Sequence, residues 1–176
     1  MERIVLVRYD PRWSELFAQE ARNLRNLFDS ELLSRIEHIG STAIVGMPAK
    51  PIIDMLIAIP SFERAKQEIL PKLIDKEYSY LWRSDRPPGH IMFIKGLQSQ
   101  NPRTHHLHFA PQEHKLWERI YFRDYLRTHP DEAKRYARLK QELAAKFSTD
   151  REAYTNGKSN YVGKITAIAR SQSTNQ

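Results

Sequence analysis

The sequence of 176 residues has 40% hydrophobic and 28% charged residues, no cysteine, and a formal net charge of +7. The length predicts a single compact domain over residues 1–176, and the composition is typical of a globular protein rather than a disordered or membrane-spanning chain. Without cysteine, the chain cannot build disulfide scaffolds, zinc ribbons, iron–sulfur clusters or a catalytic thiol.

The predicted elements begin with a helix. Asp10 suits the N-cap, Pro11 suits the first helical position, and apolar residues recur at helical spacing from Trp13 to Phe28. The elements predicted after it are strands over 35–39, 52–59, 78–83, 90–95 and 104–110, a turn at 85–89, and helices over 61–75, 112–128, 131–147 and 159–169. Strands with helices packed on them predict an α+β fold whose C-terminal part is helical.

The most informative passage is residues 36–59, IEHIGSTAIVGMPAKPIIDMLIAI. A strand delivers Gly40 and Ser41, and the next strand carries Asp54. Glycine lets a backbone approach a phosphate closely, serine supplies hydroxyl and amide donors, and the N-terminus of a following helix favours an anion. Asp54 on a rigid strand is then a candidate magnesium ligand. The alternative is that Gly40 serves only turn geometry and that Asp54 is a paired, buried acid.

Five segments of the chain carry a wider resemblance. They are YDPRW at 9–13, IEHIGSTAIVGMPAKPIID at 36–54, HHLHF at 105–109, FRDYLRTHP at 122–130 and YTNGKSNYV at 154–162. Together they resemble the GrpB-like family, which is also found fused to the C-terminus of some dephospho-coenzyme A kinases. The passage 36–59 also resembles the signature of the nucleotidyltransferase superfamily. The resemblance implies a nucleotidyltransferase-like mixed sheet with flanking helices, and a pocket that recognises a nucleotide or another phosphorylated small molecule.

The chain departs from the superfamily pattern in its carboxylates. Two-metal nucleotidyl transfer needs two or three clustered carboxylates, but the second expected position is Leu56. The later strands, HIMFIK at 90–95 and HHLHFA at 105–110, contain no acid either. Glu37 or Asp85 could still approach the pocket from elsewhere in the chain. We therefore expect at most a divalent cation such as Mg²⁺ or Mn²⁺, with Asp54 as its protein ligand.

Two histidines lie two positions apart on a predicted strand. His106 and His108 should project from one face, while their neighbours point into the core. Imidazoles in that position could act as general acid and base, donate to a phosphate, or bind a transition metal with Asp54 or His38. The alternative is a pair of solvent-facing histidines.

Further cations complete the candidate site. Lys50 precedes the acidic strand, where a cation could neutralise a phosphate or a developing oxyanion. Arg123 on a helix could equally form a structural ion pair. The candidate catalytic residues are Asp54, His106, His108, Lys50 and His38, and the candidate substrate-binding residues are Gly40, Ser41, Thr42, Arg83, His90, Arg123 and Lys158.

The positive charge favours a partner that carries phosphate. Nucleic acid is the less favoured partner, because the chain has no basic run and no aromatic-basic RNA-binding signature, and the bases of 115–146 interleave with acids. Residues 1–9 lack the apolar core and cleavage site of a secretory signal, so we expect a cytoplasmic protein. We expect a transferase-like enzyme acting on a nucleotide or other phosphorylated small molecule, with a non-catalytic nucleotide- or coenzyme-binding module as the alternative.

Overall fold

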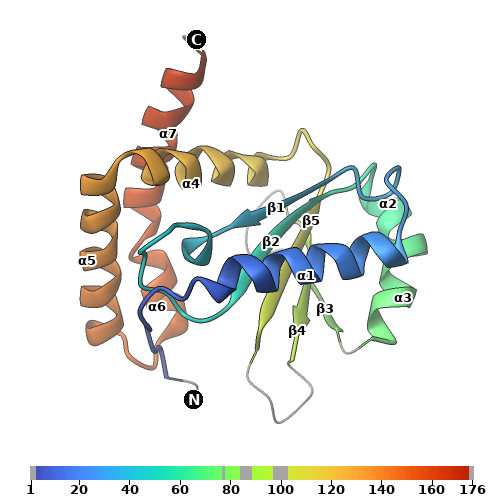
Figure 1. The fold of residues 1–176 in the computed structure, drawn as a ribbon, viewed down its shortest axis with the longest axis horizontal. Coiled ribbons are helices and arrows are strands. Elements are labelled where there is room, and N and C mark those ends of the chain that lie inside the picture. Colours follow the sequence, from blue (N-terminus) through green and yellow to red (C-terminus); the bar gives the residue numbers. More distant parts are fainter. Residues whose placement is uncertain (1–2, 77, 84–88, 97–102, 175–176) are drawn as a thin grey trace.

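The computed structural model describes residues 3–76, 78–83, 89–96 and 103–174 (Figure 1). Within this part of the chain the strands are β1 (Arg35–Ile39), β2 (Ile53–Ala58), β3 (Tyr78–Trp82), β4 (Ile91–Lys95) and β5 (His105–Ala110). They form one sheet in the order β1-β2-β5-β4-β3, in which β2 and β5 run parallel and the other neighbours run antiparallel. The predicted α+β class and the mixed sheet are therefore confirmed.

The helices occupy two regions of the chain. Around the first three strands they are α1 (Arg12–Leu27), the 3-10 turn η1 (Ser41–Ala43), α2 (Phe62–Arg64), the π-helical segment η2 (Ala65–Ile69) and α3 (Leu70–Ile74). After the sheet they are the 3-10 turn η3 (Lys115–Glu118), α4 (Arg119–Thr128), α5 (Pro130–Lys146), α6 (Arg151–Asn156) and α7 (Ser159–Thr174). The predicted helical C-terminal part is confirmed, and α1 crosses the sheet on the side facing the viewer in Figure 1.

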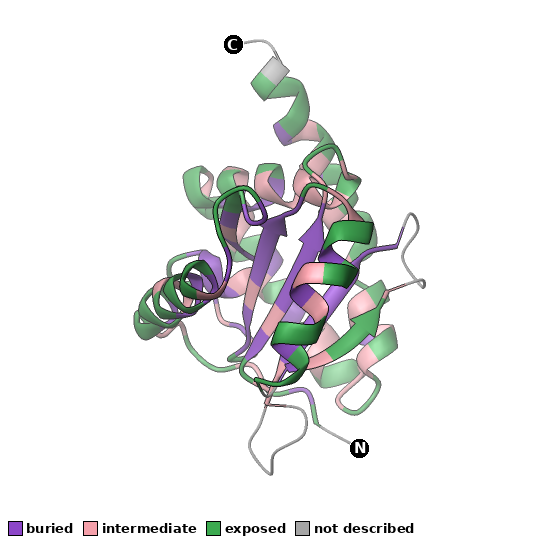
Figure 2. Cartoon of the chain, turned by 90° about the vertical axis from the view of Figure 1, so that its right-hand side faces the viewer, coloured by how far each residue is buried: buried purple, intermediate pink, exposed green. Residues whose placement is uncertain are grey.

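Strand periodicity gives the sheet two different faces. Side chains alternate along β2 and β5, so Met55 and Leu107 point one way while Asp54 and His106 point the other. The first face forms the main core with apolar residues of α1 such as Leu24. Figure 2 shows the central strands buried along most of their length. The polar side chains therefore leave the sheet on the face opposite the main core.

A second apolar cluster fixes the loop after β1 to the C-terminal helices. Ile44 and Met47 of this loop pack with Phe122 of α4, Tyr136 of α5 and Ile165 of α7. Each of these side chains is buried. The loop that carries the Gly40–Ser41 turn is thus held between the sheet and the helices.

Two predicted helices differ from the structure. The helix expected over 61–75 begins one residue later, at Phe62, because Ser61 caps it by accepting the Arg64 backbone N–H on Oγ, and the π-helical segment then interrupts it. The helix expected over 112–128 becomes regular only at Arg119, because His114 Nδ1 accepts the Leu116 N–H and a 3-10 turn forms first. Local side-chain capping therefore sets where each of these helices starts.

Two other differences concern the C-terminal helices. Helix α5 begins at Pro130 itself, where the missing proline N–H costs no hydrogen bond. Helix α6 was not expected, although Asp150 caps it by accepting the Ala153 N–H at 2.9 Å. The predicted turn at 85–89 and the candidate Asp85 lie outside the described residues, except for Gly89. None of the described helices combines the length and the apolar character needed to cross a bilayer.

Candidate functional site

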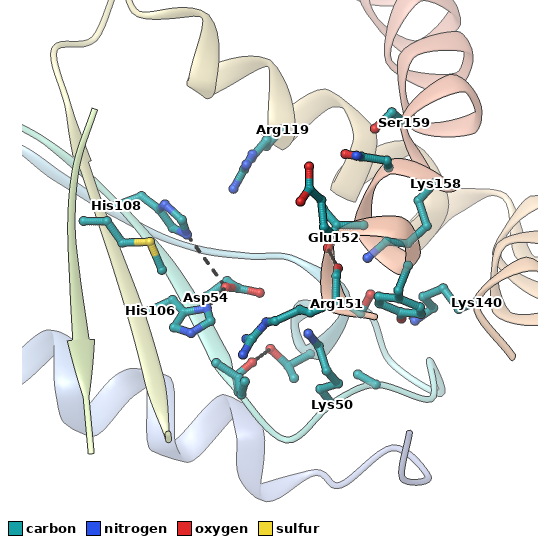
Figure 3. A pocket seen from close by; sticks show the side chains of 18 of the residues that line it. Lys50, Asp54, His106, His108, Arg119, Lys140, Arg151, Glu152, Lys158 and Ser159 are labelled. Carbon is teal, nitrogen blue, oxygen red and sulfur yellow. Dashed lines mark hydrogen bonds and ion pairs between the residues drawn. The ribbon is translucent and has the colours of Figure 1, made fainter. Parts of the chain in front are cut away.

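A cavity of about 890 Å³ lies between the polar face of the sheet and the C-terminal helices (Figure 3). Its described lining contains more bases than acids: Lys50, Arg83, Arg119, Lys140, Arg151 and Lys158 against Asp54 and Glu152. Such an excess of positive charge in a concave site with low-dielectric walls attracts anions. The cavity is therefore suited to a ligand with several negative charges.

The floor of the cavity is built on the Gly40 turn. Gly40 has φ 72° and ψ −172°, a conformation almost confined to glycine. A Cβ atom at this position would lie 2.5 Å from Asp54 Oδ2. The sequence predicted that glycine would admit a phosphate, whereas the close approach seen here is that of the Asp54 carboxylate. The expected helix after the turn is only the 3-10 turn η1, too short to supply a helix-dipole anion site.

Asp54 meets both predicted histidines. His106 Nδ1 lies 3.2 Å from Asp54 Oδ1, and His108 Nε2 lies 3.8 Å from the same oxygen. Burial alone would raise the pKa of Asp54, but the hydrogen bond from His106 and the nearby ring of His108 outweigh it and hold the pKa well below its ordinary value. The carboxylate is therefore ionised at neutral pH, and the 30% exposure of its side chain favours the same charged form.

A third histidine, His90, contacts His108 and so joins the group formed by Asp54, His106 and His108. His90 Nε2 lies 2.8 Å from His108 Nδ1. Burial lowers the pKa of His108 to about 4 and that of His90 to about 3, so both rings are neutral at pH 7. With the His108 proton on Nε2, toward Asp54, its Nδ1 accepts the His90 Nε2–H. This leaves His90 Nδ1 as a bare acceptor, and that atom is buried without a hydrogen-bond partner among the described residues.

Lys140 is a functional candidate that the sequence analysis missed. It is only 1% exposed, and its Nζ donates to Ser41 Oγ at 2.9 Å and to the Pro48 carbonyl. Burial and the charge of Lys158 lower the pKa of Lys140 to about 7. A usable sign was its position four residues after Tyr136, which places both residues on the same face of α5.

We expect Lys140 to make anion binding depend on pH. Because its pKa lies near 7, the ammonium group loses its proton as the pH rises, and the cavity then loses one charge. The affinity for sulfate, which does not titrate near neutral pH, should fall about tenfold between pH 6.5 and 8.5 as this nearby charge is lost. Isothermal titration calorimetry at several pH values measures this change.

Lys140→Arg and Lys134→Arg provide the matched comparison on one helix. Arginine keeps its charge throughout this pH range, so Lys140→Arg should flatten the profile. Lys134 pairs with Asp131 at 3.4 Å on the exposed side of α5, and Lys134→Arg should leave the profile unchanged. A wild-type sulfate affinity that stays constant from pH 6.5 to 8.5 would contradict this role for Lys140.

The ring of Tyr154 contacts the ammonium groups of two predicted lysines, Lys50 and Lys158. Lys158 Nζ lies 4.0 Å and Lys50 Nζ lies 5.5 Å from the ring centroid. The ring is buried, and burial raises the pKa of the Tyr154 phenol to about 12. Cation–π attraction therefore helps to hold both ammonium groups at the cavity.

Three candidate residues are not part of the cavity lining, namely Gly40, His38 and Arg123. His38 points to the main-core face, where its ring stacks on Phe17 at 4.8 Å and its Nε2 lies 3.0 Å from Thr42 Oγ1. Arg123 NH1 binds Glu37 at 2.6 Å, which corresponds to the ion-pair alternative. Since Glu37 is engaged there, it does not join Asp54 as a second carboxylate.

The structure brings the remaining candidates together around the cavity. The predicted residues that line it are Ser41, Thr42, Lys50, Asp54, Arg83, His90, His106, His108 and Lys158. The Gly40 backbone lies against the Asp54 carboxylate, so close that a Cβ at Gly40 would be 2.5 Å from Asp54 Oδ2. The lining residues that were not predicted come mainly from the C-terminal helices, including Arg119, Lys140, Arg151, Glu152 and Tyr154.

The donor set offers little for a metal ion. Within the described ranges, no group of three or more histidine, aspartate or glutamate side chains is placed to hold one. Asp54 already accepts a hydrogen bond from His106, and the surrounding bases repel a free cation. These residues do not fit a two-metal centre, and the predicted Mg²⁺ or Mn²⁺ would depend on oxygen ligands from a phosphorylated compound. That cation stays a prediction.

Comparisons with known proteins identify relatives along nearly the whole chain. The family model described as GrpB protein matches residues 3–167. The chain is 40% identical over 165 residues to a UPF0157 protein of Pseudomonas aeruginosa and 38% identical over 165 residues to UPF0157 protein YqkA of Bacillus subtilis. These matches cover 93% and 91% of this chain but only 66% and 45% of the two relatives.

Two further matches span relatives of similar length. The chain is 35% identical to glutamate-rich protein GrpB of Alkalihalophilus pseudofirmus, with 92% of this chain and 93% of that protein covered. The crystal structure of conserved protein GrpB from Enterococcus faecalis superposes with a TM-score of 0.84 at 29% identity, covering 96% of this chain and 98% of that one. The names of these relatives state no reaction and no ligand.

Proposed function

The chain belongs to the GrpB protein family, and on that premise we propose that its cavity binds a nucleotide or another phosphorylated small molecule and transfers a nucleotidyl or phosphoryl group. The supporting observation is the excess of lysine and arginine around one ionised carboxylate. Phosphate groups are the common biological anions that match such a lining. The resemblance of residues 36–59 to the nucleotidyltransferase signature supports the same reaction class.

The Asp54–His106 pair is the candidate proton acceptor. Asp54 Oδ1 accepts the Nδ1–H of His106, which leaves His106 Nε2 as the basic nitrogen, and that atom has no hydrogen-bond partner among the residues described. A carboxylate that orients an imidazole in this way is a common general-base arrangement. Because His106 Nε2 is buried, the ring has to shift when a substrate binds.

The proposed step balances without further reactants. The oxygen of a substrate hydroxyl attacks phosphorus, its proton passes to His106, and the bond from phosphorus to the leaving oxygen breaks. The bases of the cavity then stabilise the charge that develops on the phosphoryl oxygens and on the leaving phosphate.

Asp54→Asn separates binding from transfer. Removing one negative charge from a cationic cavity should raise the affinity for ATP about tenfold, because the carboxylate repels phosphate. Transfer should fall by about 100-fold or more, because the asparagine amide no longer orients His106 as a base. Binding is measured by calorimetry, and products from ATP and a panel of hydroxyl acceptors are measured by ³¹P NMR.

Glu152→Gln is the matched control. It removes the other carboxylate of the described lining, so ATP affinity should rise while transfer is retained. Equal transfer by wild type and Asp54→Asn would contradict the proposed role of Asp54.

A non-catalytic binding module is the second candidate function. It is favoured by one observation, namely that Leu56 lies opposite His108 where a second carboxylate could stand. ATP binding by wild type and both variants, unaffected by EDTA and without any product, would support the module over the transferase.

A further inference from the structure

The bases of the cavity form two groups on either side of Asp54. We infer that the ligand carries two separate phosphate groups joined by an uncharged, hydroxyl-bearing part, as in a sugar or polyol bisphosphate. This inference rests on the proposed function and adds the substrate class. The first group is Lys50, Lys140, Lys158 and Arg151, which enters the cavity from the side of Lys50 in Figure 3, and the second is Arg83 and Arg119.

The lysine group is gathered around Tyr154. Lys50 and Lys158 both lie against this ring, at 5.5 and 4.0 Å from its centroid. Lys140 is close enough to Lys158 for their charges to repel. The cluster comes from the loop before β2, from α5 and from the residue before α7, so it exists only in the folded chain. A phosphate bound here offsets the mutual repulsion of three ammonium groups.

The arginine group lies beside the histidines. Arg83 donates to Met92 Sδ at 3.7 Å, and Met92 is paired with His108 in the sheet. Arg119 starts α4, and both arginines act electrostatically on His90. Figure 3 shows Arg119 above Asp54, and its charge acts on His108, whereas Lys50, Lys140 and Lys158 lie to the right of Asp54.

The carboxylate between the two groups decides what the middle of the ligand can be. Ionised Asp54 repels a phosphate placed against it but accepts hydrogen bonds from hydroxyl groups. A continuous polyphosphate chain would carry negative charge past this oxygen, while a polyol would present donors to it. The volume of about 890 Å³ is ample for a hexose with a phosphate at each end.

Calorimetry with matched probes tests the inference. Glucose 1,6-bisphosphate should bind at least about 100-fold more tightly than glucose 1-phosphate or glucose 6-phosphate, because two charge-assisted sites act on one molecule. It should also bind more tightly than tripolyphosphate. Comparable affinities for the bisphosphate and either monophosphate, or tighter binding of tripolyphosphate, would overturn the inference and leave the proposed function standing.

Variants in each group provide the second arm. Arg119→Met and Lys158→Met should each weaken bisphosphate binding about tenfold, whereas a given monophosphate should respond strongly to only one of them. If the methionine variants fold poorly, Arg119→Lys and Lys158→Arg take their place, since they change the contacts to phosphate but keep the charge. Lys134→Met is the control on the exposed side of α5. If both methionine variants weaken both monophosphates equally, the two groups are one site and the inference fails. If none of these probes binds but ATP does, only the inference fails, and if ATP does not bind either, the proposed function fails with it.

Discussion

Gly40→Ala is expected to destabilise the protein by about 3 kcal/mol, and so to lower its melting temperature by about 10 °C. Two costs combine. The backbone conformation at φ 72° and ψ −172° is strained for any residue with a Cβ, and the new methyl group would overlap Asp54 Oδ2 at 2.5 Å. Differential scanning calorimetry at neutral pH measures the loss.

Gly46→Ala is the matched control for this prediction. Gly46 also has a positive φ, 77°, but nothing lies within 4 Å of where its Cβ would stand. It should therefore cost only the backbone strain, about 1–2 kcal/mol. If the two variants lose the same stability, the close contact between Gly40 and Asp54 is not what requires glycine.

Acidification is expected to cause a second large loss of stability. Burial lowers the pKa of His38 and of His108 to about 4 and that of His90 to about 3. In the unfolded chain these histidines titrate near 6.5, so below that pH the unfolded state binds more protons. The free energy of unfolding should then fall by about 1.4 kcal/mol per pH unit for each histidine as the pH drops from 6.5 toward 4.

The pH dependence is measured by urea unfolding at half-unit steps from pH 7.5 to 4.5. His38→Phe removes one titrating group and keeps an aromatic ring against Phe17. Its profile should therefore be less steep than that of wild type, even if its stability at pH 7.5 is lower. An unfolding free energy that stays level between pH 6.5 and 5 would contradict the assignment of neutral, buried histidines.

Much of the fold follows from local patterns in the chain. The buried run at Ile53–Ala58 and the alternation in His105–Ala110 predict strands whose observed bounds differ by at most one residue. Helix ends were harder, because capping by a single side chain moves them. His114 accepts a backbone N–H and imposes a 3-10 turn, and Asp150 starts a helix too short to show periodicity.

The site was predictable on the strands and largely hidden on the helices. Asp54 and His106 are paired across β2 and β5, and their alternation shows which way they point. Lys140 looks like an ordinary member of a charged helix, and its spacing of four residues from Tyr136 is the one local sign that it is buried, here against Ser41. His38 shows the opposite error, because strand alternation sends it to the far face.

The parallel pairing of β2 with β5 also governs when the site can exist. Asp54 and His106 are 52 positions apart in the chain, and β3 and β4 lie between them in sequence. During synthesis, Asp54 emerges long before its partner strand, and this pairing has to wait for a slow, non-local step of folding. A chain that has not reached β5 lacks His106 and His108 on the polar face of the sheet, so ligand binding by nascent or truncated chains would report completed folding.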